Sequence, residues 1–128
     1  MHTYHTPLDL VRERSPERPV ALVRPDAVSV AARWFQSEFK GDVFYAVKAN
    51  PSPDLIRTLF ASGITHFDVA SLAELDDAAT IPGVKLHFMH PVKSRLAIRT
   101  AYYKYGVRCF ALDTEDELNK ILEETGNA

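Results

Sequence analysis

The chain alternates between short apolar runs rich in β-branched and aromatic residues and longer segments whose apolar residues recur with helical spacing. The short runs predict strands at residues 19–24, 43–48, 66–70, 85–90 and 109–112. The segments between and after them predict helices with apolar faces, which include Val28, Ala31, Phe35 and Phe39, then Leu55, Ile56, Leu59 and Phe60, and finally Leu118, Ile121 and Leu122. Strands that alternate with helices in this way are typical of parallel β/α units.

Helix-capping residues support the same division. Ser52 is followed by Pro53, an N-cap with proline at the first helical position, and both Ser71 with Glu74 and Thr114 with Glu117 fit a capping box. From the second strand onward, each strand and helix repeats after about twenty residues, a length that suits short loops.

A repeating β/α chain forms either an open doubly wound sheet or part of a barrel. No G-x-G-x-x-G follows the first predicted strand, which disfavours a dinucleotide-binding sheet. Polar residues instead recur at the carboxyl ends of successive strands, namely Lys48 and Asn50, Asp68 and Ser71, His90, and Asp113. Barrel enzymes build their active sites on that side, so the pattern favours part of a barrel.

Among these residues, Lys48 is the best candidate for a reactive side chain. By the two-residue alternation of a strand, it shares a face with Phe44 and Ala46, which is expected to be the barrel interior. A lysine at the rim of an apolar interior is partly desolvated, and its neutral amine can attack a carbonyl group. The alternative is the ordinary one, in which the side chain extends into solvent.

Composition narrows the function classes. The 128 residues are 46% hydrophobic and 25% charged, as in a folded globular unit, and the net charge of -2 is interspersed, which predicts no nucleic-acid partner. No apolar run is long enough to span a membrane, and the first residues lack the apolar core of a signal peptide. The single cysteine, Cys109, excludes an intrachain disulfide and is expected to be a small buried side chain. We therefore expect a cytoplasmic protein.

Metal binding is not expected. His2 with His5, and His87 with His90, have H-x-x-H spacing, but residues three apart on a strand point to opposite faces. No cysteine or carboxylate nearby completes a ligand set.

Four sequence blocks carry a resemblance to a known family: FYAVKANP at 44–51, FDVASLAEL at 67–75, HPVKS at 90–94 and GVRCFALDTEDEL at 106–118. In this order and spacing they resemble the amino-terminal half of the barrel in the ornithine/diaminopimelate decarboxylase family, which are pyridoxal-phosphate enzymes with an alanine-racemase-like barrel. The resemblance extends from about residue 19 to the end of the chain.

This resemblance implies an α/β fold, the amino-terminal half of a (β/α)8 TIM barrel of the alanine-racemase type. About four parallel barrel strands are expected, with one further strand from a neighbouring β domain. The implied domain organisation is a polar lead at 1–18, the β-domain strand at 19–25, and a partial TIM-barrel pyridoxal-phosphate-binding domain at 26–128, truncated at residue 128.

The resemblance also implies site residues and a reaction. Lys48 matches the lysine that attaches pyridoxal 5'-phosphate through its aldehyde, and Asp68 matches the aspartate beside the cofactor ring. The implied full-length enzyme is a homodimer that decarboxylates a small basic amino acid, in polyamine biosynthesis. The isolated 128-residue chain is expected to be inactive. The alternative is a non-catalytic homologue, or a protein that carries the cofactor or binds regulatory partners.

Two local features point to one branch of the family. Pro51 follows Asn50 where alanine racemases resemble A-V-x-K-A-N-A-Y-G, so a racemase is disfavoured. The run from Ala70 to Glu74 is closer to the ornithine-type enzymes, which favours ornithine as substrate and putrescine as product. Lysine or a related basic amino acid stays open as an alternative.

Overall fold

Three parallel strands form the centre of the computed structural model, which describes residues 2–127. They are β1 (Phe44–Ala46), β2 (His66–Val69) and β3 (Lys85–Phe88), adjacent in the order β1-β2-β3. Their register pairs Ala46 with Asp68 and Asp68 with His87. The parallel sheet expected from the alternating pattern is confirmed.

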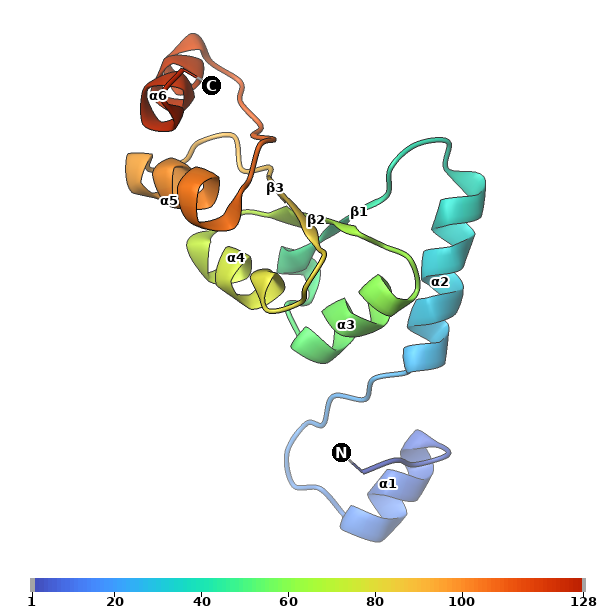
Figure 1. Cartoon of the computed structure of the whole chain (residues 1–128). Coiled ribbons are helices and arrows are strands. Elements are labelled where there is room, and N and C mark those ends of the chain that lie inside the picture. The colour runs from blue at the N-terminus through green and yellow to red at the C-terminus, as the bar shows by residue number, and fades with distance from the viewer. Residues whose placement is uncertain (1, 128) are drawn as a thin grey trace.

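Two crossover helices cover one face of this sheet (Figure 1). Helix α3 (Pro53–Ala61) connects β1 to β2, and α4 (Leu72–Ala79) connects β2 to β3. Alternate strand residues point toward these helices, because side chains on a strand alternate between the two faces. The fully or almost fully buried core residues of this layer are Phe67, Val69 and Phe88 from the strands and Ile56, Leu59, Leu75 and Ala78 from the helices. The opposite face of the sheet carries His66, Asp68, Lys85 and His87 together with Phe44 and Ala46.

The remaining helices lie around this centre. Helix α2 (Pro25–Glu38) packs beside α3, and α5 (Arg95–Tyr105) lies between α4 and α6 (Glu115–Thr125). Ser71, Ser94 and Thr114 each accept a hydrogen bond from the backbone amide three residues later, at 3.1–3.2 Å, and so begin α4, α5 and α6. Gly106, at φ 70°, ends α5 in the left-handed conformation that glycine adopts without strain.

All four strands predicted from residue 43 onward are shorter than expected, the first and the last of them by the most. Strand β1 ends at Ala46, because the Val47 carbonyl accepts a hydrogen bond from the Asn50 amide at 3.1 Å and closes the short 3-10 helix η1 (Val47–Ala49). The strand expected at 109–112 is reduced to one parallel bridge, from Phe88 to Phe110.

The strand predicted at 19–24 is absent from the described residues. This segment is a loop between α1 and α2, and its apolar side chains Val20, Leu22 and Val23 are exposed. An apolar run becomes a strand only where a neighbour offers backbone partners, and none within residues 2–127 pairs with it. Its assignment to a β domain stays a prediction.

The expected polar lead contains a helix that was not predicted, α1 (Pro7–Arg14). Thr6 and Asp9 form a reciprocal capping box, and Pro7 occupies the first turn. An N-cap threonine, a proline in the first turn and an acid three residues after the N-cap are together typical of a helix N-terminus. None of the helices within residues 2–127 combines the length and apolarity needed to cross a bilayer.

The packed face of α2 also differs from the predicted stripe. Val28 is partly buried as expected, but the fully buried residue is Ala32. The amide group of Gln36 donates to the Ser62 carbonyl at 2.9 Å and ties α2 to the end of α3. The predicted face residues Phe35 and Phe39 are instead more than half exposed, as is the adjacent Trp34.

Candidate functional site

The structure brings Lys48 and Asp68 together at the carboxyl edge of the sheet. Lys48 lies in η1, directly after β1, and Asp68 lies on the neighbouring strand β2, opposite Ala46. Burial raises the pKa of the Asp68 carboxyl group, whereas the positive charge of Lys48 lowers it and the negative charge of Glu74 raises it further. The amine and the carboxylate therefore lie within electrostatic reach of each other, as the strand-end pattern predicted.

The partial desolvation expected for Lys48 at the rim of an apolar interior is not found within the described residues. The strand alternation that would have turned Lys48 inward stops at Ala46, and Lys48 is exposed on the 3-10 turn. The inner face of the sheet is also open within residues 2–127, since Phe44 on that face is 39% exposed. The prediction of a desolvated amine assumed a closed ring of strands, whereas three strands are present.

Glu74 organises the turn that follows Asp68. Its Oε2 accepts a hydrogen bond from the Ala70 amide at 3.0 Å, and Ser71 accepts one from the Glu74 amide at 3.2 Å. Ser71 is the N-cap as predicted, but the carboxylate of Glu74 accepts from the Ala70 amide and not from the Ser71 amide, so the reciprocal half of the predicted capping box is shifted by one residue. Together these bonds fix the exit of β2 toward α4. Beside it, an open hollow of about 310 Å³ lies next to the carboxyl ends of β2 and β3, and its lining includes Ala70, Ser71, His90, Lys93 and Ser94.

Two histidines form a second polar cluster, on the inner face nearer the start of the strands. Nδ1 of His66 and Nε2 of His87 lie 2.8 Å apart, and Phe44 stacks on both rings with centroid distances of 4.9 and 4.2 Å. Nζ of Lys85 lies 3.4 Å from Nε2 of His66, while Nδ1 of His87 is buried without a hydrogen-bond partner among the described residues. The pairing of His66 with His87 was not predicted, although His66 shares the inner face with Asp68 by strand alternation.

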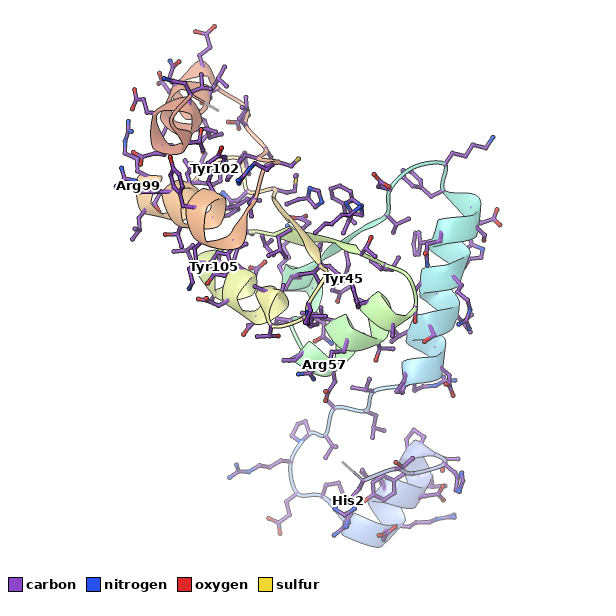
Figure 2. All side chains as sticks on the ribbon, in the orientation of Figure 1. His2, Tyr45, Arg57, Arg99, Tyr102 and Tyr105 are labelled. Carbon is purple, nitrogen blue, oxygen red and sulfur yellow. The ribbon has the colours of Figure 1, made fainter. Side chains whose placement is uncertain are left out.

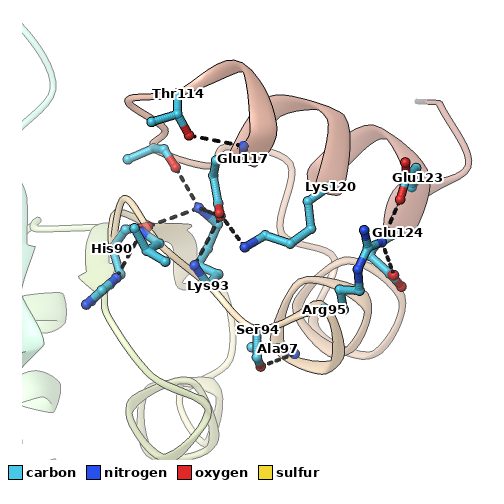
Figure 3. Close-up of polar contacts among 12 residues, drawn as sticks. His90, Lys93, Ser94, Arg95, Ala97, Thr114, Glu117, Lys120, Glu123 and Glu124 are labelled. Atoms are coloured by element: carbon cyan, nitrogen blue, oxygen red, sulfur yellow. Dashed lines mark hydrogen bonds and ion pairs between the residues drawn. The ribbon is translucent and has the colours of Figure 1, made fainter.

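A buried ion pair anchors the loop that follows β3 (Figure 3). Lys93 pairs with Glu117 of α6, and its ammonium group also donates to the backbone carbonyls of His90 at 3.0 Å and Ala111 at 2.6 Å. Glu117 was predicted only as part of a capping box. Its amide does donate to Thr114, but its carboxylate is committed to Lys93 and Lys120.

The other singled-out residues lie at the surface. His90 is exposed, and its Nδ1 accepts from the Val92 amide at 3.2 Å; Asp113 is exposed after the bridge at Phe110. Cys109 is exposed as well, so its predicted burial is wrong. Within the described residues, no three His, Cys, Asp or Glu side chains are placed to hold a metal ion together.

Comparison with known proteins decides the family. Residues 26–128 match the family model described as "Pyridoxal-dependent decarboxylase, pyridoxal binding domain". The chain belongs to this family. The match spans most of the chain and includes Lys48, Asp68 and the buried pair of Lys93 and Glu117.

The chain is also similar to individual proteins described as decarboxylases. The chain is 34% identical over 91 residues to the lysine/ornithine decarboxylase of Selenomonas ruminantium, a match that covers 70% of this chain and 23% of the relative. Among solved structures it resembles the lysine/ornithine decarboxylase from Vibrio vulnificus complexed with putrescine, with a TM-score of 0.80, 28% identity, and coverage of 94% of this chain and 33% of that one. An SrLDC mutant in complex with PLP gives a TM-score of 0.81 at 27% identity, with 97% and 32% coverage.

These matches confirm the expected α/β barrel-type fold and the recognised family. This pyridoxal-dependent decarboxylase domain spans 23% of the length of the first curated relative and about a third of the solved chains. Its donor set fits pyridoxal phosphate, because an aldehyde needs an accessible primary amine and Lys48 is exposed beside the Asp68 carboxylate.

Proposed function

We propose that this protein contributes the cofactor-binding part of a pyridoxal-phosphate-dependent decarboxylase for a basic amino acid. The observation that carries the proposal is the placement of the Lys48 amine beside the Asp68 carboxylate at the carboxyl edge of β1 and β2. Lys48 would hold the cofactor covalently, and Asp68 would lie beside its ring. When bound, the cofactor supplies an electron sink for the bond between Cα and the carboxylate of the substrate.

Residues of this chain prepare the site in defined ways. Lys48 presents a primary amine on a short turn, where solvent and a ligand can reach it. Asp68 places a negative charge on the inner face, next to that amine, and offsets its positive charge. Glu74 and Ser71 fix the turn that follows Asp68, which keeps the carboxylate in register with β1.

Ornithine is the substrate we propose, with putrescine as product and a role in polyamine biosynthesis. The run from Ala70 to Glu74 supports this choice, and relatives described as lysine/ornithine decarboxylases support the wider class of basic amino acids. We further propose a cytoplasmic homodimer as the active form. Because the chain spans about a third of the solved relatives, turnover is proposed to require further polypeptide.

Chemical trapping tests the cofactor role directly. The protein is incubated with pyridoxal phosphate, reduced with borohydride, digested and analysed by mass spectrometry. We expect the pyridoxyl mass on Lys48 at low cofactor concentration, and its loss in Lys48→Ala but not in Lys85→Ala, which removes another exposed lysine on the same sheet. Labelling spread evenly over the exposed lysines would refute the assignment.

A second measurement separates catalysis from cofactor carriage. An assembly that contains this domain and the remaining parts found in its relatives is assayed for carbon dioxide release from ornithine and from lysine. Release that depends on Lys48 supports a decarboxylase. Cofactor attachment at Lys48 without release from either amino acid would instead support the carrier or regulatory alternative.

A further inference from the structure

The turn that carries Lys48 is held by a side chain outside the candidate site. Helix η1 is a single turn, and the hydrogen bond from the Asn50 amide to the Val47 carbonyl closes its end. The hydroxyl of Tyr45, two residues before Val47 on β1, donates to the Asn50 carbonyl at 3.2 Å. Tyr45 therefore connects strand β1, which precedes the turn, to Asn50, the first residue after the turn.

The tyrosine ring is itself fixed in place. Tyr45 lies on the side of the sheet that faces the helices (Figure 2), where it packs against the core. Its ring meets Phe67 of β2 edge-on, with a centroid distance of 6.3 Å, and Phe67 is completely buried. A hydroxyl on a ring anchored in this way approaches the Asn50 carbonyl from a defined direction.

Asn50 also connects the turn to helix α3. Its side-chain Oδ1 accepts a hydrogen bond from the Ser52 amide at 3.1 Å, and the Ser52 carbonyl accepts from Ile56 in the first turn of α3. Val47, between Tyr45 and Lys48, is completely buried. Lys48 is thus the exposed residue of a turn that is held on both sides.

We propose that Tyr45 is a positioning residue for Lys48, which restricts the volume that the amine samples and so favours its attachment to the cofactor. The inference rests on the proposed function of Lys48. Tyr45 does not itself reach the inner face, because its side chain lies on the opposite side of the sheet. Loss of one neutral hydrogen bond changes a local equilibrium by about 3- to 10-fold, and this range sets the size of the expected effect.

Tyr45→Phe tests the proposal, because it keeps the ring that packs on Phe67 and removes only the hydroxyl. The first readout needs no cofactor: amide hydrogen exchange of residues 47–50. We expect exchange at the Asn50 amide to be about 3- to 10-fold faster in Tyr45→Phe, at an unchanged melting temperature. The matched control is Tyr102→Phe on α5, a residue that contacts Arg108 and Tyr103 and lies far from η1 in the sequence.

The second readout is the rate of pyridoxyl incorporation at Lys48, relative to incorporation at Lys85 in the same sample. We expect Tyr45→Phe to lower this ratio about 3- to 10-fold and Tyr102→Phe to leave it unchanged. Wild-type exchange and a wild-type ratio in Tyr45→Phe would overturn the inference. Absence of preferred labelling at Lys48 in the wild-type protein would overturn the proposed function instead, while the exchange measurement would still report on the turn.

Discussion

Nζ of Lys93 lies 2.8 Å from Oε1 of Glu117, and the two side chains are 0% and 3% exposed. This pair connects the loop after β3 to the first turn of α6, and the Glu117 carboxylate also accepts from the Lys93 backbone amide at 3.1 Å (Figure 3). Buried charges are tolerated only when they are paired and hydrogen-bonded, and both conditions are met here.

Breaking this pair is expected to be costly. Lys93→Met leaves the Glu117 carboxylate buried with Lys120 as its remaining cationic partner. We expect the free energy of unfolding to fall by about 3 kcal/mol, at the lower end of the range for buried pairs, because Lys120 still compensates part of the charge. Urea unfolding at pH 7.5 measures the change. Lys104→Met is the control, since Lys104 forms an exposed pair with Asp76 and should matter little.

The companion variant isolates the charge effect. Adding Glu117→Gln to Lys93→Met removes the negative charge that has lost one of its two cationic partners but keeps an oxygen that can accept from the backbone amide of residue 93. We expect the double variant to regain part of the lost stability. A double variant no more stable than Lys93→Met would show that packing, not charge, dominates at this position.

The histidine cluster predicts a loss of stability in mild acid. Burial lowers the pKa of His87 below its ordinary value of 6.5; the nearby His66 and Lys85 lower it further, and Asp42 opposes them. The unfolded chain therefore takes up the proton more readily than the folded chain. The contribution of His87 is fully present above about pH 6.5 and is lost as the pH falls toward the lowered value.

Urea unfolding at pH 7.5, 6.5 and 5.5 measures this effect. In the wild-type protein the free energy of unfolding should decrease toward pH 5.5, and His87→Phe should show a shallower decrease while it keeps the stacking on Phe44. His5→Ala, at an exposed position before α1, is the control. If His87→Phe kept the full wild-type slope, the loss would have to come from other groups.

Asp68 is expected to strengthen cofactor binding. Asp68→Asn keeps the shape of the side chain but removes the negative charge beside Lys48. Hydrogen bonds and contacts to charged groups contribute about 1.5–3 kcal/mol, so we expect about 10- to 100-fold weaker retention of pyridoxal phosphate. Equilibrium dialysis with absorbance detection measures it. Asp113→Asn, at an exposed position after Phe110, should retain wild-type affinity; equal losses in both variants would argue against a specific role for Asp68.

The 128-residue chain alone is expected to bind the cofactor without turnover. It spans about a third of the solved relatives, and the groups that would orient the substrate carboxylate are proposed to lie in the parts that it does not cover. Carbon dioxide release from ornithine, measured with purified chain and pyridoxal phosphate, should stay at background. Robust release by the chain alone would require a complete site within these residues.

Local chemistry made much of this fold predictable. The N-caps at Ser71 and Thr114 and the apolar spacing of α3 identified helices correctly, because these signals depend on residues within one or two turns. The parallel arrangement followed from strand–helix alternation. The placement of Lys48 and Asp68 at one edge then followed from topology alone, since the carboxyl ends of parallel strands meet at the same side.

Other features depended on distant residues or on small differences in backbone geometry. The pairing of Lys93 with Glu117 joins residues from different β/α units, which no local pattern reveals. The end of β1 at Ala46 is set by the turn closed at Asn50, and the alternation of strand residues does not predict where the strand ends. Residues 19–24 have strand-like composition but lack a partner among the described residues, so composition alone was misleading.

Lys48 and Asp68 belong to a single crossover, β1–α3–β2, in which one short helix closes the connection. Contacts between segments this close in sequence form quickly during folding, because little chain entropy is lost when the loop closes. The amine and its neighbouring acid can consequently come together on a nascent chain, before any more distant part of the polypeptide has to find its place.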